Sequence, residues 1–95
     1  MSYKRESYMT DSEALELARK YLETEKRHAK VDDKILMIAS HFRYSAGRVL
    51  TVESISFGYM GPSKTGYIHK VAEDKCEMPI GPDYYEVIIG EVGHE

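Results

Sequence analysis

The chain has no tryptophan, two phenylalanines and one cysteine, Cys76, in 95 residues. A single cysteine cannot form an intramolecular disulfide, which excludes a disulfide scaffold and indicates a reducing compartment. No stretch approaches the roughly 18 apolar residues of a transmembrane helix. Lys4 and Arg5 are not followed by the apolar run of a signal peptide. We therefore expect a cytoplasmic protein.

No set of residues has the spacing of a catalytic or metal site. Cys76 is flanked by Asp74 and Glu77, whose negative charges oppose formation of a reactive thiolate. Residues 58–66 resemble a phosphate-binding loop, but Ser63 stands where that loop needs glycine. The four histidines lack metal-ligand spacing, and no second cysteine supports a zinc site. The sequence thus predicts no enzyme, no cofactor and no metal.

Acidic residues are concentrated in the second half of the chain, although the net charge is only −3. Residues 1–48 contain 10 Lys/Arg and 8 Asp/Glu, a balance of +2, whereas residues 49–95 contain 3 and 8, a balance of −5. An acidic surface repels phosphates, which argues against a nucleic-acid partner, and it attracts basic proteins. We expect a basic protein partner, with no nucleic acid and no membrane bound.

Tyrosine is abundant, with 8 residues. It combines apolar area with a polar tip and is enriched at protein interfaces. Tyr84 and Tyr85 are neighbours on a predicted strand, so one of them must point outward. The residues predicted to bind the partner are Asp83, Tyr84, Tyr85, Glu86 and Glu91.

The most secure predicted element is a helix that starts after Thr10. Thr10 and Glu13 match a capping box, and apolar residues then recur at helical spacing. The apolar pattern runs out near residues 28–30, where we expect the helix to end. Residues 1–9 have no clear period and are expected to form a flexible leader ahead of a single domain, 10–95.

Residues 34–59 are expected to form a β-hairpin around which the rest is organised. Residues 35–44 form its first strand, residues 45–47 the turn, and residues 48–52 the return alongside residues 42–44. Helical spacing of the apolar residues in 33–46 keeps a second helix open as the alternative. The alternation slips after Val52, which predicts a bulge near Glu53 and Ser54.

Two further strands are expected over residues 67–72 and 84–89, with residues 58–66 as a turn. The fold class is α+β, with one N-terminal amphipathic helix packed on an antiparallel sheet of about four strands, arranged as a meander. The last strand is expected at an edge, where it could pair with a partner or with a second copy to form a homodimer.

Three segments together resemble the YrhB-type immunity proteins of bacterial toxin systems: Glu13–Leu22, His41–Gly47 and Lys64–His69. The resemblance implies a small cytoplasmic protein that binds and neutralises a partner toxin. It carries over no functional residue, because the shared motifs are structural. A phage or mobile-element protein that inhibits a host defence complex is an alternative. A small-ligand domain or enzyme with a pocket between helix and sheet is another.

Overall fold

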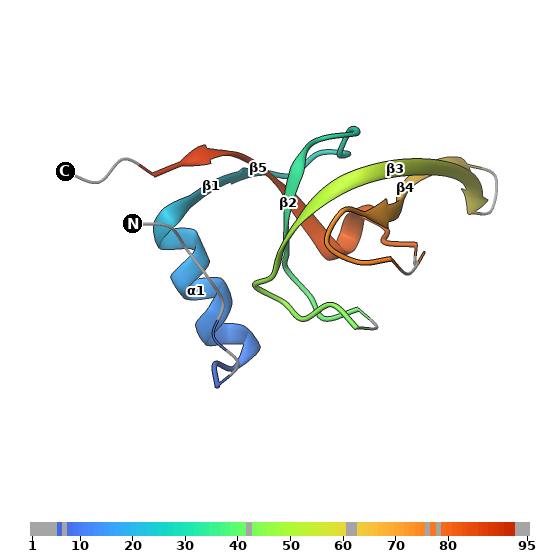
Figure 1. Ribbon diagram of the computed structural model, residues 1–95. Coiled ribbons are helices and arrows are strands. Elements are labelled where there is room, and N and C mark those ends of the chain that lie inside the picture. Colours follow the sequence, from blue (N-terminus) through green and yellow to red (C-terminus); the bar gives the residue numbers. More distant parts are fainter. Residues whose placement is uncertain are drawn as a thin grey trace.

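The computed structural model describes residues 6, 8–41, 43–60, 63–75, 77 and 79–92, and Figure 1 shows their arrangement. In chain order the elements are α1 (Asp11–Tyr21), β1 (Leu22–Glu25), β2 (Lys34–Met37), β3 (Val49–Met60), β4 (Ser63–Val71), the 3-10 helix η1 (Pro82–Tyr84) and β5 (Tyr85–Glu91). All strand pairs are antiparallel. The predicted α+β class is therefore confirmed. Most of the predicted leader, 1–9, lies outside the described residues.

The strands lie in the order β1-β5-β2-β3-β4. β2, β3 and β4 follow one another as in the predicted meander, but β5 returns to the interior of the sheet and pairs with both β1 and β2. The prediction that the last strand lies at an edge is therefore wrong. Among the described residues the sheet has five strands, and its two edges are β1 and β4.

α1 begins at the predicted capping box. The Thr10 hydroxyl oxygen accepts a hydrogen bond from the backbone N–H of Glu13 at 3.2 Å, and the Glu13 carboxylate accepts one from the N–H of Thr10 at 3.2 Å. These bonds satisfy N–H groups that the start of a helix leaves without intrahelical partners.

α1 ends at Tyr21, so the predicted end near residues 28–30 is wrong. Leu22 is already extended, with φ −118° and ψ 134°, and it begins β1. The backbone N–H of Val92, directly after β5, donates to the Tyr21 carbonyl at 2.9 Å. A carbonyl of the last helical turn thus accepts a hydrogen bond from the chain beyond β5. The residues after Tyr21 pair with β5 as strand β1 and do not continue the helix.

β2 and β3 form the predicted hairpin, and the alternative of a helix over residues 33–46 is not observed. The first strand is shorter than predicted, because the chain leaves the sheet after Met37. It rejoins at Gly47, whose N–H donates to the Met37 carbonyl at 2.7 Å. Gly47 has φ 89°, a conformation that glycine adopts without strain. Tyr44 therefore does not pair with β3; its side chain enters the core, 1% exposed.

The bulge predicted near Glu53 and Ser54 is confirmed. The pairing of β3 with β4 shifts between Val52 and Ser54 and again before Ile55. Val52 is fully buried and Ile55 packs against the core, so the extra residue lets both contribute to it. A bulge also bends the strand that carries it, and β3 curves strongly in Figure 1.

Gly58 and Gly66 lie inside β3 and β4, so the long turn predicted here is wrong, and the strands leave only residues 61 and 62 between them. Each glycine faces an aromatic ring from the opposite strand. A Cβ atom on Gly66 would lie 3.0 Å from Cε1 of Phe57, and one on Gly58 would lie 3.2 Å from Cε1 of Tyr67. The two glycines therefore allow an aromatic ring to pack closely against the backbone, and they do not form a turn.

The two faces of the central strands pack against different partners. Leu36 pairs with Glu86 across β2 and β5, and Arg19 of α1 contacts Glu86, so α1 covers this face. The opposite face carries the main core, which draws on every strand except β1. Its buried residues are Ala29, Ile35, Met37, Tyr44, Leu50, Val52, Ile68, Val71, Ile80, Tyr85 and Val87.

Ile80 joins the curled edge of the sheet to the chain that leads into β5. Its N–H donates to the Ile68 carbonyl at 2.8 Å, and the N–H of Ile68 donates to the Ile80 carbonyl at 3.0 Å. Both side chains are buried. The connection from β4 to β5 thus covers the concave side of the sheet, while α1 lies at the other end of the molecule from the tip of the β3–β4 hairpin (Figure 1).

Ala18 is the sharpest test of how α1 packs, because its side chain is fully buried. We expect Ala18→Leu to destabilise the fold by about 1–3 kcal/mol through overpacking. Glu16→Leu adds the same side chain at an exposed position of the same helix and should change stability by less than about 0.5 kcal/mol. Urea unfolding measures both, and equal effects would contradict the packing described here.

Candidate functional site

The five residues predicted to bind a partner do not share one surface. Tyr85 is 2% exposed and belongs to the core. Asp83 and Tyr84 lie together in η1 and are exposed, which confirms that one of the two adjacent tyrosines points outward. Glu86 faces α1, and Glu91 lies at the far end of β5. Only Asp83 and Tyr84 are therefore brought together on the surface.

Glu86 is engaged within the fold. Its Oε1 atom accepts hydrogen bonds from Nη1 of Arg19 at 3.0 Å and from the hydroxyl of Thr24 at 2.8 Å. Burial raises the pKa of this carboxyl group, but the bonds from Arg19 and Thr24 together with the charge of Lys26 outweigh burial, and the pKa lies below its ordinary value. The carboxylate thus joins α1 to β5 and is largely neutralised locally.

The Tyr84 ring packs against the ring of His41. The His41 and Tyr84 ring centroids are 4.2 Å apart with the planes tilted by 32°. Nε2 of His41 lies 2.8 Å from the carbonyl oxygen of Pro79, within hydrogen-bonding distance. These contacts fasten η1 and the chain before it to the loop that follows β2.

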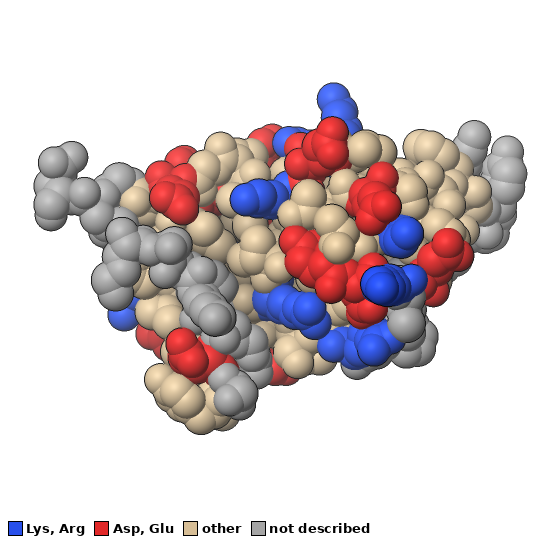
Figure 2. Space-filling view, viewed as in Figure 1, with Lys and Arg blue, Asp and Glu red and all other residues tan. Residues whose placement is uncertain are grey.

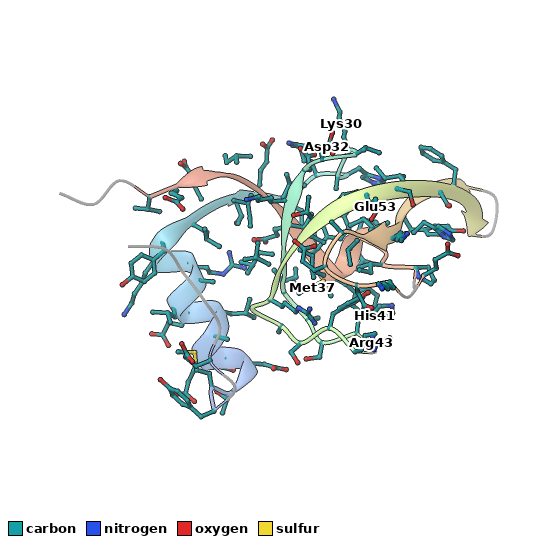
Figure 3. The ribbon with its side chains drawn as sticks, in the orientation of Figure 1. Lys30, Asp32, Met37, His41, Arg43 and Glu53 are labelled. Carbon is teal, nitrogen blue, oxygen red and sulfur yellow. The ribbon has the colours of Figure 1, made fainter. Side chains whose placement is uncertain are left out.

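The same loop is fastened to residue Asp74. Arg43 and Asp74 form an ion pair at 3.1 Å. Burial raises the pKa of the Tyr44 hydroxyl, and the charge of Asp74 and a hydrogen bond to it raise that pKa further. His41 and Arg43 lie at the end of the molecule away from Lys30, as Figure 3 shows. We assign this cluster a structural role, because its polar groups bond to one another.

A solvent-open apolar groove of about 480 Å³ lies between the connection from β1 to β2 and the curled β3–β4 hairpin. Two side chains beside it are strongly exposed for apolar residues, Phe57 at 65% and Val31 at 53%. Its lining consists of residues 28–31 on one side and of Ile55, Phe57, Gly66, Tyr67, Ile68 and Tyr85 on the other. We call this surface the apolar groove.

Hydrogen bonds fix the segment that forms one wall of the apolar groove. The N–H of Ala29 donates to the Tyr85 hydroxyl at 3.0 Å, a bond that is buried. Asp33 Oδ2 accepts from the N–H of Lys30 at 2.9 Å and from Nη1 of Arg27 at 3.2 Å. The wall is thus ordered before any ligand arrives, which lowers the entropic cost of binding.

Charge on the displayed face is mixed and not of one sign. Figure 2 shows acidic and basic side chains interleaved over the centre of this face. Lys70 pairs with Glu53 at 3.6 Å, and Nε2 of His69 lies 3.2 Å from a carboxylate oxygen of Glu77. The acidic balance of the second half of the chain therefore does not appear here as one continuous acidic patch.

Within the described residues, the side chains suited to metal binding lie apart. Among them, no three His, Cys, Asp or Glu side chains are placed to hold a metal ion. Neither His41 nor His69 lines the apolar groove, which instead includes His28. Cys76 lies outside the described residues. Over the part of the chain that the structure describes, no helix is both long and apolar enough to span a bilayer.

Sequence reasoning missed the apolar groove. The sequence features that belong to this groove are short. Val31 is a single apolar residue in a charged stretch. Phe57 precedes Gly58, and Tyr67 follows Gly66. In the sequence alone, glycines next to aromatic residues indicate a turn. Only the pairing of Phe57 with Gly66 across β3 and β4 reveals that they form a wall.

No protein-family model, no curated protein and no solved structure matches the chain. The resemblance to YrhB-type immunity proteins therefore stays a prediction.

The bond between Arg19 and Glu86 should make stability depend on pH. Because the pKa of Glu86 is lower in the folded protein than in the unfolded chain, its stabilisation is present at neutral pH and is lost as pH falls through the folded-state pKa. We expect Arg19→Met to cost about 1 kcal/mol or less at neutral pH, since Arg19 is half exposed, and nearly nothing once Glu86 is protonated.

Urea unfolding at neutral and at acidic pH measures this difference. Lys20→Met is the matched control, because it removes an exposed positive charge from the same helical turn. Its effect should be smaller and should not follow the protonation of Glu86. An Arg19→Met penalty that is unchanged at acidic pH would contradict the role given to this pair.

Proposed function

We propose that this protein is a non-catalytic protein-binding module that takes up an apolar side chain of a partner protein in the apolar groove. The single observation that carries the proposal is an ordered apolar groove flanked by strongly exposed Phe57 and Val31. Exposed apolar residues that gather around a depression mark interaction sites more often than residues scattered singly. Aromatic anchors in such depressions supply much of the binding energy of interfaces.

Two features favour a macromolecular partner over a small substrate. Pockets for small ligands bury most of the ligand surface. The apolar groove is open to solvent, so a partner that covers Phe57 and Val31 with its own surface would bury far more apolar area than a small molecule could. The lining also contains no carboxylate.

Binding without turnover is what a stoichiometric inhibitor or immunity protein needs. We therefore propose a cytoplasmic protein that neutralises a partner by occupying it, in agreement with the resemblance to YrhB-type immunity proteins. The exposed Asp83 and Tyr84 remain a second docking location, the one that would suit a basic partner. The two locations can be separated by mutation.

The test is selection of a random 12-residue peptide display library on the protein. We expect enriched peptides whose affinity falls at least about tenfold with Phe57→Ser, a loss typical of an aromatic anchor. Ile89→Ser is the matched control, because Ile89 is 50% exposed but does not line the apolar groove. It should change affinity less than twofold.

Asp83→Lys distinguishes the second docking location. Enriched peptides that lose affinity with Asp83→Lys and keep it with Phe57→Ser would overturn the assignment to the apolar groove. Failure to enrich any peptide over a selection without the protein would count against a protein-binding role altogether. Circular dichroism and thermal unfolding confirm that each variant is folded.

A further inference from the structure

The lining of the apolar groove contains basic side chains and no acidic one. His28 and Lys30 both contribute to it, and both are exposed. Nδ1 of His28 lies 3.7 Å from the position that a Cβ atom on Gly66 would occupy, so the imidazole lies close to Gly66 of β4. Lys30 projects outward from the connection between β1 and β2, as Figure 3 shows.

The nearby acidic groups that form ion pairs do so with Arg27 and not with Lys30. Asp33 and Glu25 both pair with Arg27, at 3.2 and 3.6 Å. Asp32 lies beside Lys30 at the same tip (Figure 3) but does not line the groove. The Lys30 ammonium group forms no ion pair with any described residue. A cation therefore stands next to apolar surface without a carboxylate of its own.

We infer that the partner segment in the apolar groove carries a carboxylate close to its apolar anchor, an inference that rests on the function proposed above. The apolar side chain packs against Phe57 and Ile55, and the Asp or Glu side chain next to it contacts Lys30 and His28. The partner is thus acidic where it docks, the opposite of the basic partner that the composition of the second half predicts.

The overall charge of −3 does not conflict with this assignment. At physiological salt, charges interact over roughly 8 Å, so the groups around the groove dominate over distant acids. Charges at the rim of an interface act mainly on association rate and on the choice of partner. Lys30 therefore selects among apolar segments, whereas Phe57 supplies affinity.

A fatty-acid carboxylate combines the same two chemical features. We assign the groove to a protein segment, because its open side leaves an acyl chain exposed to water, whereas a folded partner covers Phe57 and Val31. Decanoate serves as the probe for this distinction. Displacement of a selected peptide by decanoate well below its micelle-forming concentration would overturn the assignment to a protein segment.

The deciding experiment compares peptides selected on the wild-type protein with peptides selected on Lys30→Glu. We expect Asp or Glu within two positions of an apolar residue in the first set, and Lys or Arg there in the second. Lys30→Gln should weaken a peptide from the first set about fivefold and flatten its salt dependence. Lys70→Gln is the matched control, because Lys70 pairs with Glu53 outside the groove, and it should leave affinity unchanged.

The outcomes separate the two proposals. Peptides that need Phe57 but contain no excess of acids and bind Lys30→Gln as well as wild type would overturn the inference and leave the proposed function standing. Peptides rich in Lys or Arg from selection on the wild-type protein would also overturn it. Failure to enrich any peptide would remove both.

Discussion

The hydrogen bonding of β5 to β1 on one side and β2 on the other is the constraint on which the rest of the structure depends. Alternation along β5 sends Tyr85 and Val87 into the main core and turns Glu86 towards Arg19 of α1. The same strand ends next to α1, where the backbone N–H of Val92 donates to the Tyr21 carbonyl in the last turn of the helix. One central strand therefore positions the helix, the core and, through the Tyr85 hydroxyl, the wall of the apolar groove.

The curl of the β3–β4 hairpin turns a sheet face into a binding surface. The bulge after Val52 bends β3, and Ile80 fastens β4 to the chain that precedes β5. Beyond that point Phe57 lies over Gly66 and is 65% exposed. Apolar surface that the fold cannot bury is stabilised most simply by another molecule, which is why the groove is the strongest candidate site.

The distribution of charge links this surface to specificity. Some carboxylates elsewhere are engaged, with Glu86 bonded to Arg19 and Thr24, and Asp74 paired with Arg43. In the connection before β2, Arg27 bonds to Asp33 within the fold, whereas Lys30 points to solvent. Net composition therefore describes the sign of the average surface, and the pairing of individual groups decides which charges a partner meets.

The sequence by itself determined the α+β class, the start of α1 at Thr10, the turn at Gly47 and the bulge after Val52, because each depends on residues close together in the chain. Tertiary structure decided where α1 ends and that β5 lies inside the sheet, since both result from pairing between residues far apart in sequence. It also decided the groove, which needs residues 28–31 to face a ring and a glycine on two later strands. Caps and turns are stabilised by interactions between residues close together in the chain, so local sequence patterns predict them. A surface formed by distant segments exists only once the chain has folded.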